Sequence, residues 1–174
     1  LVDRIVSAPR DAHPLYQTDP LLSVAEPFAF WGIELNGPSP IDHPVIQCVD
    51  DVSAFALRKV RILNGAHTAL VEKVKDGFVT VREAMSDQET RNWLESVVTE
   101  EIVPCVDDRV EDASQFARDV FERFENPFLD HRLADIALHQ AEKIKVRLLP
   151  TYNDYYQKFG KPPALLGQVI SQDL

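Results

Sequence analysis

The sequence predicts a mainly helical domain with a small β element near its N-terminus. Apolar residues recur at helical spacing from about residue 51 onward. The first fifty residues hold seven prolines, from Pro9 to Pro44, which interrupt any long helix. With 174 residues, 45% of them hydrophobic, the chain is long enough to bury one core. We therefore expect a single domain spanning residues 1–174.

The β element is predicted from two short segments of strand-like composition. Residues 28–35 (FAFWGIEL) and 45–49 (VIQCV) are rich in aromatic and β-branched side chains. An Asn-Gly-Pro turn at residues 36–38 separates them. We expect the two segments to lie in one small sheet.

The first two predicted helices come after the strand segments and are indicated by cap residues and apolar periodicity. Candidate caps at residues 50–53 begin a helix whose apolar periodicity continues to residues 76–77. A capping-box pattern at residues 86–89 (SDQE) begins the second helix, and Pro104 is its predicted end.

The remaining chain predicts a third and a fourth helix, so its second half is typical of a helical bundle. The third is indicated by phenylalanines and valine at residues 116–124 and ends at the Asn-Pro pair 126–127. The fourth shows apolar periodicity over residues 133–144 and is expected to end at Pro150. A new apolar segment begins at Leu165, close to the end of the chain, which is typical of a truncated element.

Composition excludes several classes of function. The formal net charge of -10 argues against a nucleic-acid groove and against binding to an anionic membrane. No stretch approaches the roughly 20 apolar residues that span a bilayer. The five histidines form no HxH or HExxH pattern, so no metal is implied. Cys48 and Cys105 lie far apart, which indicates free thiols in a cytoplasmic protein.

The residues that carry chemistry lie in the segment 58–68 (RKVRILNGAHT). On an α-helix that turns about 100° per residue, Asn64 lies about 140° and His67 about 80° from Lys59, so all three share one half of the surface. A lysine partly buried near other cations exchanges protons near neutral pH. Asparagine and histidine N–H groups can donate to a developing oxyanion. We expect Lys59 to be the acid/base and Asn64 and His67 to stabilise the oxyanion in a metal-free carbonyl reduction or alcohol oxidation.

The same three residues also fit a simpler interpretation, a solvated helix face with one polar core contact, and spacing alone does not separate the two. The unusual feature is that Asn64 and His67 lie inside an otherwise apolar stretch, residues 62–70, beside the helix-weakening Gly65. Polar groups in apolar surroundings are costly unless something binds them.

The KxxxxNxxH pattern of residues 59–67 resembles the signature of the polyol-specific long-chain dehydrogenases, the mannitol dehydrogenase family. Further segments agree with that family in order and type, and the resemblance covers nearly the whole chain. These segments are residues 1–6 (LVDRIV), 81–87 (VREAMSD), 100–104 (EEIVP) and 123–128 (RFENPF).

The resemblance implies a helical C-terminal dehydrogenase domain like that of 6-phosphogluconate dehydrogenase, which supplies the catalytic helix to an N-terminal Rossmann-type domain that binds NAD. No GxGxxG pattern occurs here, and the family's second oxyanion-hole asparagine would precede Leu1. We therefore expect a fragment truncated at both ends, with the Rossmann domain absent and the isolated chain inactive.

The activity that the resemblance implies is NAD-dependent interconversion of altronate and tagaturonate, in hexuronate breakdown. The alternatives within the family are the fructuronate/mannonate and the fructose/mannitol reactions. An alternative of another class is a non-catalytic helical interaction module that retains the fold alone.

The expected partner is a small sugar acid, whose carboxylate requires a cation beyond Lys59. The candidates are Arg61, Arg132, Lys143 and Arg147. The resemblance places substrate-contacting residues near Arg132 and Lys143. Glu34, in a segment that resembles the mannitol-type branch, is a further candidate for the substrate pocket.

Overall fold

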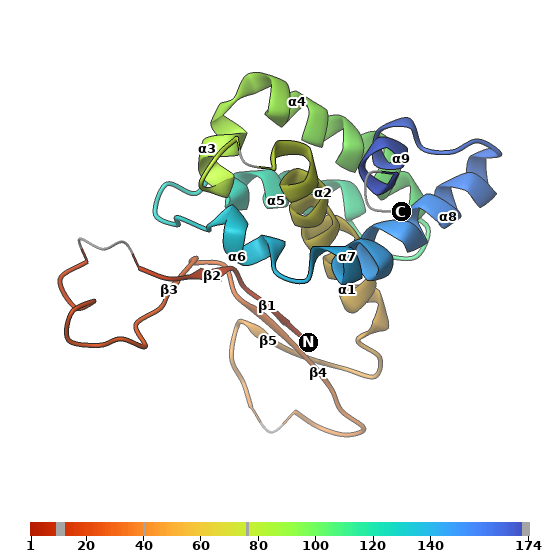
Figure 1. The fold of residues 1–174 in the computed structure, drawn as a ribbon. Coiled ribbons are helices and arrows are strands. Elements are labelled where there is room, and N and C mark those ends of the chain that lie inside the picture. The colour runs from red at the N-terminus through yellow and green to blue at the C-terminus, as the bar shows by residue number, and fades with distance from the viewer. Residues whose placement is uncertain (10–12, 40, 76, 172–174) are drawn as a thin grey trace.

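The computed structural model describes residues 1–9, 13–39, 41–75 and 77–171. It shows a helical bundle with a small β region on one side, as Figure 1 shows, and this confirms the predicted fold class. No helix in the described ranges is long and apolar enough to cross a membrane.

The β region consists of two small sheets. In the first, β4 (Phe30–Glu34) lies between β1 (Val2–Asp3), which is antiparallel to it, and β5 (Ile46–Val49), which is parallel. In the second, β2 (Val6–Ser7) pairs antiparallel with β3 (Val24–Ala25). The two predicted strand segments therefore share one sheet, although the first strand is shorter than expected.

The helical region begins after β5 and includes three π-helical segments. Its elements are α1 (Ser53–Arg58), η1 (Lys59–Asn64), α2 (Gly65–Val74), α3 (Val81–Ser86), α4 (Gln88–Ser96), η2 (Val97–Ile102), η3 (Val103–Cys105), α5 (Ala113–Phe124), α6 (Leu133–Ala137), α7 (Gln140–Lys143), η4 (Ile144–Leu148), α8 (Leu149–Phe159) and α9 (Ala164–Ile170). The π-helical segments are η1, η2 and η4.

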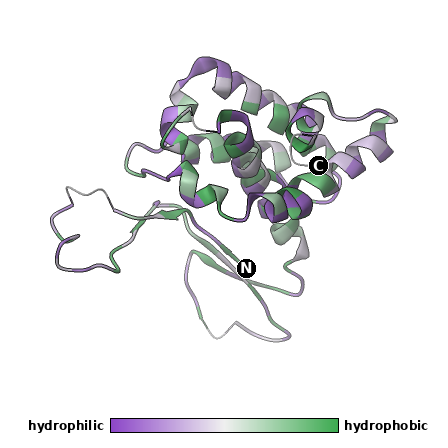
Figure 2. Ribbon diagram, in the orientation of Figure 1, coloured by the Kyte–Doolittle hydropathy of each residue, from purple (hydrophilic) through white to green (hydrophobic). Residues whose placement is uncertain are grey.

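The core surrounds α2, which lies in the middle of the bundle and contacts α4, α6, α9 and η4. Figure 2 shows the hydrophobic residues concentrated where these helices meet. The ends of the three π-helical segments come together at Gly65, whose Cα faces Ile102 of η2 and Leu148 of η4, both fully buried. Residues 61–63 of η1 and 65–72 of α2 are thus buried in the core.

The predicted capping box at residues 86–89 is wrong. The Ser86 hydroxyl donates to the Arg82 carbonyl at 2.8 Å, so Ser86 ends α3 and is not free to cap the next helix. The Asp87 carboxylate caps α4 instead, and the capping box of this region joins Thr80 and Glu83 at the start of α3. Short polar side chains fit several cap positions equally well, and the fold selects one.

The predicted course of the fourth helix also differs from the structure. The predicted end of the first helix falls at residues 76–77, of which residue 76 lies outside the described residues, and α2 ends at Val74. The fourth helix is interrupted at His139, which has a positive φ of 59°. Pro150 does not end a helix: it lies in the first turn of α8, directly after the π-helical turn η4, and the helical backbone continues through it.

A buried ionic cluster ties the β region to the bundle. The Arg123 guanidinium of α5 donates to Asp3 at 2.7 Å and to Glu26 at 2.7 Å, and all three residues are buried. The Phe28 ring covers the guanidinium with its centroid 4.4 Å from Cζ. Because both carboxylates bond the same guanidinium, their burial is tolerated, and β1 and the residue that follows β3 are held against α5.

Candidate active site

A cavity of about 330 Å³ lies where the segment after β1 meets η1, α2, α6 and η4. It brings together five of the residues named from the sequence: Lys59, Asn64, His67, Lys143 and Arg147. The other lining residues are Arg4, Ile5, Val6, Leu63, His131, Asp135 and Ile136.

The spacing of Lys59 and Asn64 matches the π-helical turn that carries them. The Gly65 N–H donates to the Val60 carbonyl, five residues earlier. A π-helix has more residues per turn than an α-helix, so it reduces the angle between Lys59 and Asn64 around the axis. Both side chains thereby face the same cavity. On a uniform α-helix the two residues would lie about 140° apart around the axis and would face it less directly.

The Lys59 amine lies at the edge of β1. Its Nζ donates to the Val2 carbonyl at 2.6 Å. Lys59 itself is half-buried, so its stem packs against the protein while the amine reaches the cavity. The β region therefore helps to position this amine, and the acid/base role remains a prediction.

His67 is the most enclosed titratable group of the cavity. Its ring stacks on Phe124 with centroids 4.1 Å apart and meets His131 edge-on at 5.0 Å. Its Nε2 atom is buried and has no hydrogen-bond partner among the described residues. Burial, followed by the nearby positive charges of His131 and Arg123, holds the pKa of His67 well below its ordinary value. A neutral imidazole with a free ring nitrogen can accept or donate one hydrogen bond to a bound oxygen.

The low pKa of His67 predicts acid sensitivity of the fold. Below about pH 6.5 the unfolded histidine binds a proton and the folded one does not, so stability falls as the pH falls, by up to about 1.4 kcal/mol per pH unit. His131, whose pKa burial also lowers, acts in the same direction. We expect urea unfolding at pH 7.5, 6.5 and 5.5 to show a clearly smaller loss of stability in His67→Phe. Equal losses in both proteins would contradict the neutral state of His67.

The cavity holds more positive charge than its protein partners neutralise. Lys143 Nζ donates to the Ile136 carbonyl at 2.5 Å, Arg147 Nη1 donates to Thr68 Oγ1 at 3.2 Å, and the Arg4 guanidinium donates to the Glu26 carbonyl. None of these cations, nor Lys59, forms an ion pair with a residue that the structure describes.

This excess of cations favours an anionic ligand. Burial lowers the pKa of Lys143 and of Arg147, so a bound anion would stabilise both charged forms. Asp135 is the one acidic residue among the described lining residues, and it is exposed. A carboxylate of a small molecule is the expected type of ligand.

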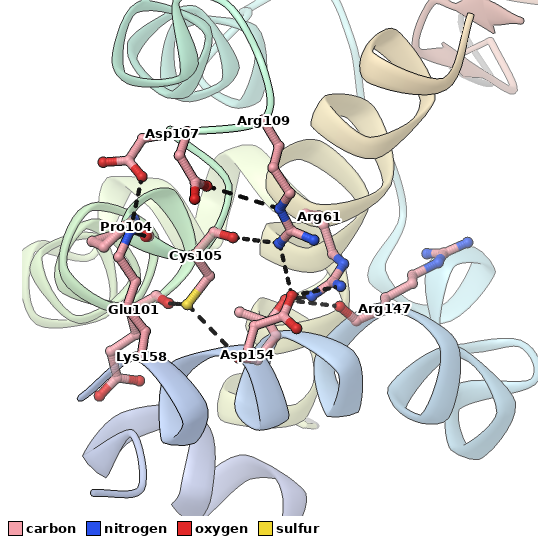
Figure 3. A network of polar contacts seen from close by, with 11 residues as sticks. Arg61, Glu101, Pro104, Cys105, Asp107, Arg109, Arg147, Asp154 and Lys158 are labelled. Atoms are coloured by element: carbon pink, nitrogen blue, oxygen red, sulfur yellow. Dashed lines mark hydrogen bonds and ion pairs between the residues drawn. The ribbon is translucent and has the colours of Figure 1, made fainter. Parts of the chain in front are cut away.

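Three predicted substrate-binding residues lie elsewhere. Arg61 points to the opposite side of η1 and donates to Asp154, as Figure 3 shows, and also to Thr151. Arg132 is exposed and lines a separate groove beside Leu133. Glu34 accepts from the Val52 N–H at 3.3 Å at the end of β4.

Sequence reasoning did not single out Arg4 and Asp135 as lining residues. Arg4 stands in the LVDRIV segment, whose resemblance to the family was the available signal. Asp135 lies on α6, where only the tertiary arrangement brings it to the cavity.

Comparison with known proteins identifies the family. A family model described as the mannitol dehydrogenase C-terminal domain matches residues 51–171. The chain therefore belongs to this family of helical dehydrogenase domains, which confirms the resemblance of its motifs.

The particular relatives are altronate oxidoreductases. The chain is 39% identical to that of Halalkalibacterium halodurans, over 95% of this chain and 35% of the relative. It is 38% identical to that of Yersinia enterocolitica, over 95% of this chain and 37% of the relative. The chain thus spans little more than a third of the length of the curated relatives it matches.

Solved structures share the fold. Pseudomonas fluorescens mannitol 2-dehydrogenase, solved as a ternary complex with NAD and D-mannitol, superposes with a TM-score of 0.81 over 99% of this chain and 37% of that chain, at 23% identity. A D-sorbitol dehydrogenase in substrate-free form gives a TM-score of 0.78 over 99% of this chain and 38% of that chain, at 22% identity.

Proposed function

We propose that this chain is the substrate-binding part of a larger NAD-dependent oxidoreductase that interconverts altronate and tagaturonate in hexuronate breakdown. The names of the curated relatives support the substrate pair. The single observation that carries the choice of a sugar acid is the cavity, in which Lys143 and Arg147 lie beside Lys59, Asn64 and His67 and have no carboxylate partner among the described residues.

Lys59, Asn64 and His67 have separate roles in the proposed alcohol oxidation. The Lys59 amine takes the proton of the substrate hydroxyl and returns it in the reverse direction. Asn64 and the neutral His67 donate hydrogen bonds to the same oxygen as negative charge develops on it. Lys143 and Arg147 hold the carboxylate at the other end of the molecule.

The residues of this chain do not fit the phosphate end of NAD. All six glycines lie in described residues, and none occupies a strand-to-helix turn that would cradle a pyrophosphate. We place the nucleotide in another part of the protein, a Rossmann-type domain outside residues 1–174. NAD would accept the hydride there, and the isolated chain would be inactive. Free Cys48 and Cys105 agree with a cytoplasmic location.

The test uses the complete protein and follows NADH loss at saturating tagaturonate, fructuronate and fructose. We expect turnover of tagaturonate at a kcat at least about tenfold above the other two. The two keto acids differ in the arrangement of a single hydroxyl group, which changes its contacts in the site, and fructose lacks the carboxylate that the cations would bind. Preference for fructuronate or fructose would assign the chain to another reaction of the family. Absence of turnover with all three would favour the non-catalytic helical module.

A further inference from the structure

Arg61 belongs to the turn that carries the catalytic-type residues, yet it contacts the opposite side of the bundle. It stands in η1 between Lys59 and Asn64 and is buried. Its guanidinium donates to Thr151 Oγ1 at 2.8 Å and to Asp154 Oδ2 at 2.9 Å, both on α8. The turn is therefore attached to α8 from behind the cavity.

Asp154 also binds a second arginine. The same Oδ2 atom accepts from Arg109 at 2.8 Å, and Arg109 donates in turn to the Cys105 carbonyl. Figure 3 shows the Asp154 carboxylate between Arg61 and Arg109, with the Arg147 guanidinium extending away from it. One carboxylate thus joins η1, α8 and the segment after η3.

The contacts of Arg61 with α8 hold η1, a π-helical turn, which is an uncommon backbone conformation. π-helical turns are rare, and most occur as single turns inside α-helices, where they are frequent at functional sites. If η1 reverted to α-helical geometry, Asn64 would rotate around the axis relative to Lys59. Burial lowers the pKa of Arg61 and the Asp154 carboxylate opposes this, so loss of Asp154 would leave a buried cation with the neutral Thr151 hydroxyl and without its carboxylate partner.

We propose that Asp154, through Arg61, is a positioning residue that holds η1 in its π-helical register, so that Lys59 and Asn64 face the cavity together. This role touches no substrate atom. The expected effect on kcat rests on the proposed function, whereas the expected effect on the backbone of η1 does not.

The first test is amide hydrogen exchange on the complete protein. In Asp154→Asn we expect peptides covering residues 59–65 to exchange at least about tenfold faster, while peptides of α5 stay unchanged, because opening becomes local. Asp107→Asn is the matched control. It removes a carboxylate that pairs at 3.2 Å with Lys158 of α8, the helix that carries Asp154, and the hydrogen bonds of Asp107 among the described residues reach Lys158 and Val103, not η1. Unchanged exchange of residues 59–65 in Asp154→Asn would overturn the proposal.

The second test is steady-state kinetics of the same variants. We expect kcat of Asp154→Asn to fall about 10- to 100-fold with KM changed less than about threefold, because misplacement by about 1 Å has effects of that size. Asp154→Glu should restore part of the loss. A lower melting temperature with an unchanged kcat per folded molecule would contradict positioning. If the unaltered protein reduces no sugar acid, the proposed function fails and the exchange result alone decides this inference.

Discussion

Replacing Lys59 by methionine in the complete protein should lower kcat by about 10²–10⁴-fold, the range that a positioned acid/base contributes. Methionine keeps an unbranched stem of similar length, so packing beside Leu63 and the β1 edge is preserved while the amine is lost. The bond from Nζ to the Val2 carbonyl disappears as well, but that carbonyl lies on exposed Val2 and can bind water.

The measurement compares Lys59→Met with Lys145→Met, an exposed lysine of η4, in the same NADH assay. The control should retain nearly full activity. Small primary amines added to Lys59→Met should recover part of the lost rate, because they replace the missing proton carrier. If Lys59→Met kept more than about a tenth of the unaltered kcat, the amine would not be the principal acid/base, since such groups contribute at least about 10².

Replacing Arg147 by methionine should lower kcat/KM for tagaturonate by about 10- to 150-fold, since a hydrogen bond to a charged group contributes about 1.5–3 kcal/mol and 1.4 kcal/mol corresponds to tenfold. The guanidinium is oriented by Thr68 Oγ1, whose hydroxyl itself donates to the Asn64 carbonyl at 2.8 Å. The arginine proposed to bind the carboxylate and the backbone of the asparagine proposed to bind the oxyanion are therefore joined through one hydroxyl.

The diagnostic comparison is between a charged and an uncharged substrate. Turnover of fructose, however slow, should change little in Arg147→Met, because fructose has no carboxylate for Arg147 to bind. Arg147→Lys should give an intermediate loss, since it keeps the charge and removes the fork. An equal loss for both substrates would show that Arg147 supports the fold and not the carboxylate.

Local pattern predicted the helical region well where burial and periodicity agree. The third predicted helix is α5, whose Phe116 and Phe124 are buried, and it ends just before the Asn-Pro pair at 126–127. The predictions of a cap at Ser86 and of a helix end at Pro150 were wrong, because each residue type occurs at more than one position of a helix. A serine can cap or bond back to the preceding turn, and a proline fits a first turn as well as an end.

The sequence by itself determined the helical class and the small N-terminal sheet, because periodicity and composition act locally. It also named Lys59, Asn64 and His67, which the structure brings to one cavity, while their catalytic roles stay a prediction. The tertiary structure alone decided which cations join them. Lys143 and Arg147 reach the cavity from η4 and the helix before it, whereas Arg61, although inside the same turn, is directed toward Asp154. That choice depends on long-range packing between segments some ninety residues apart, and on a π-helical turn whose geometry the residue pattern does not encode.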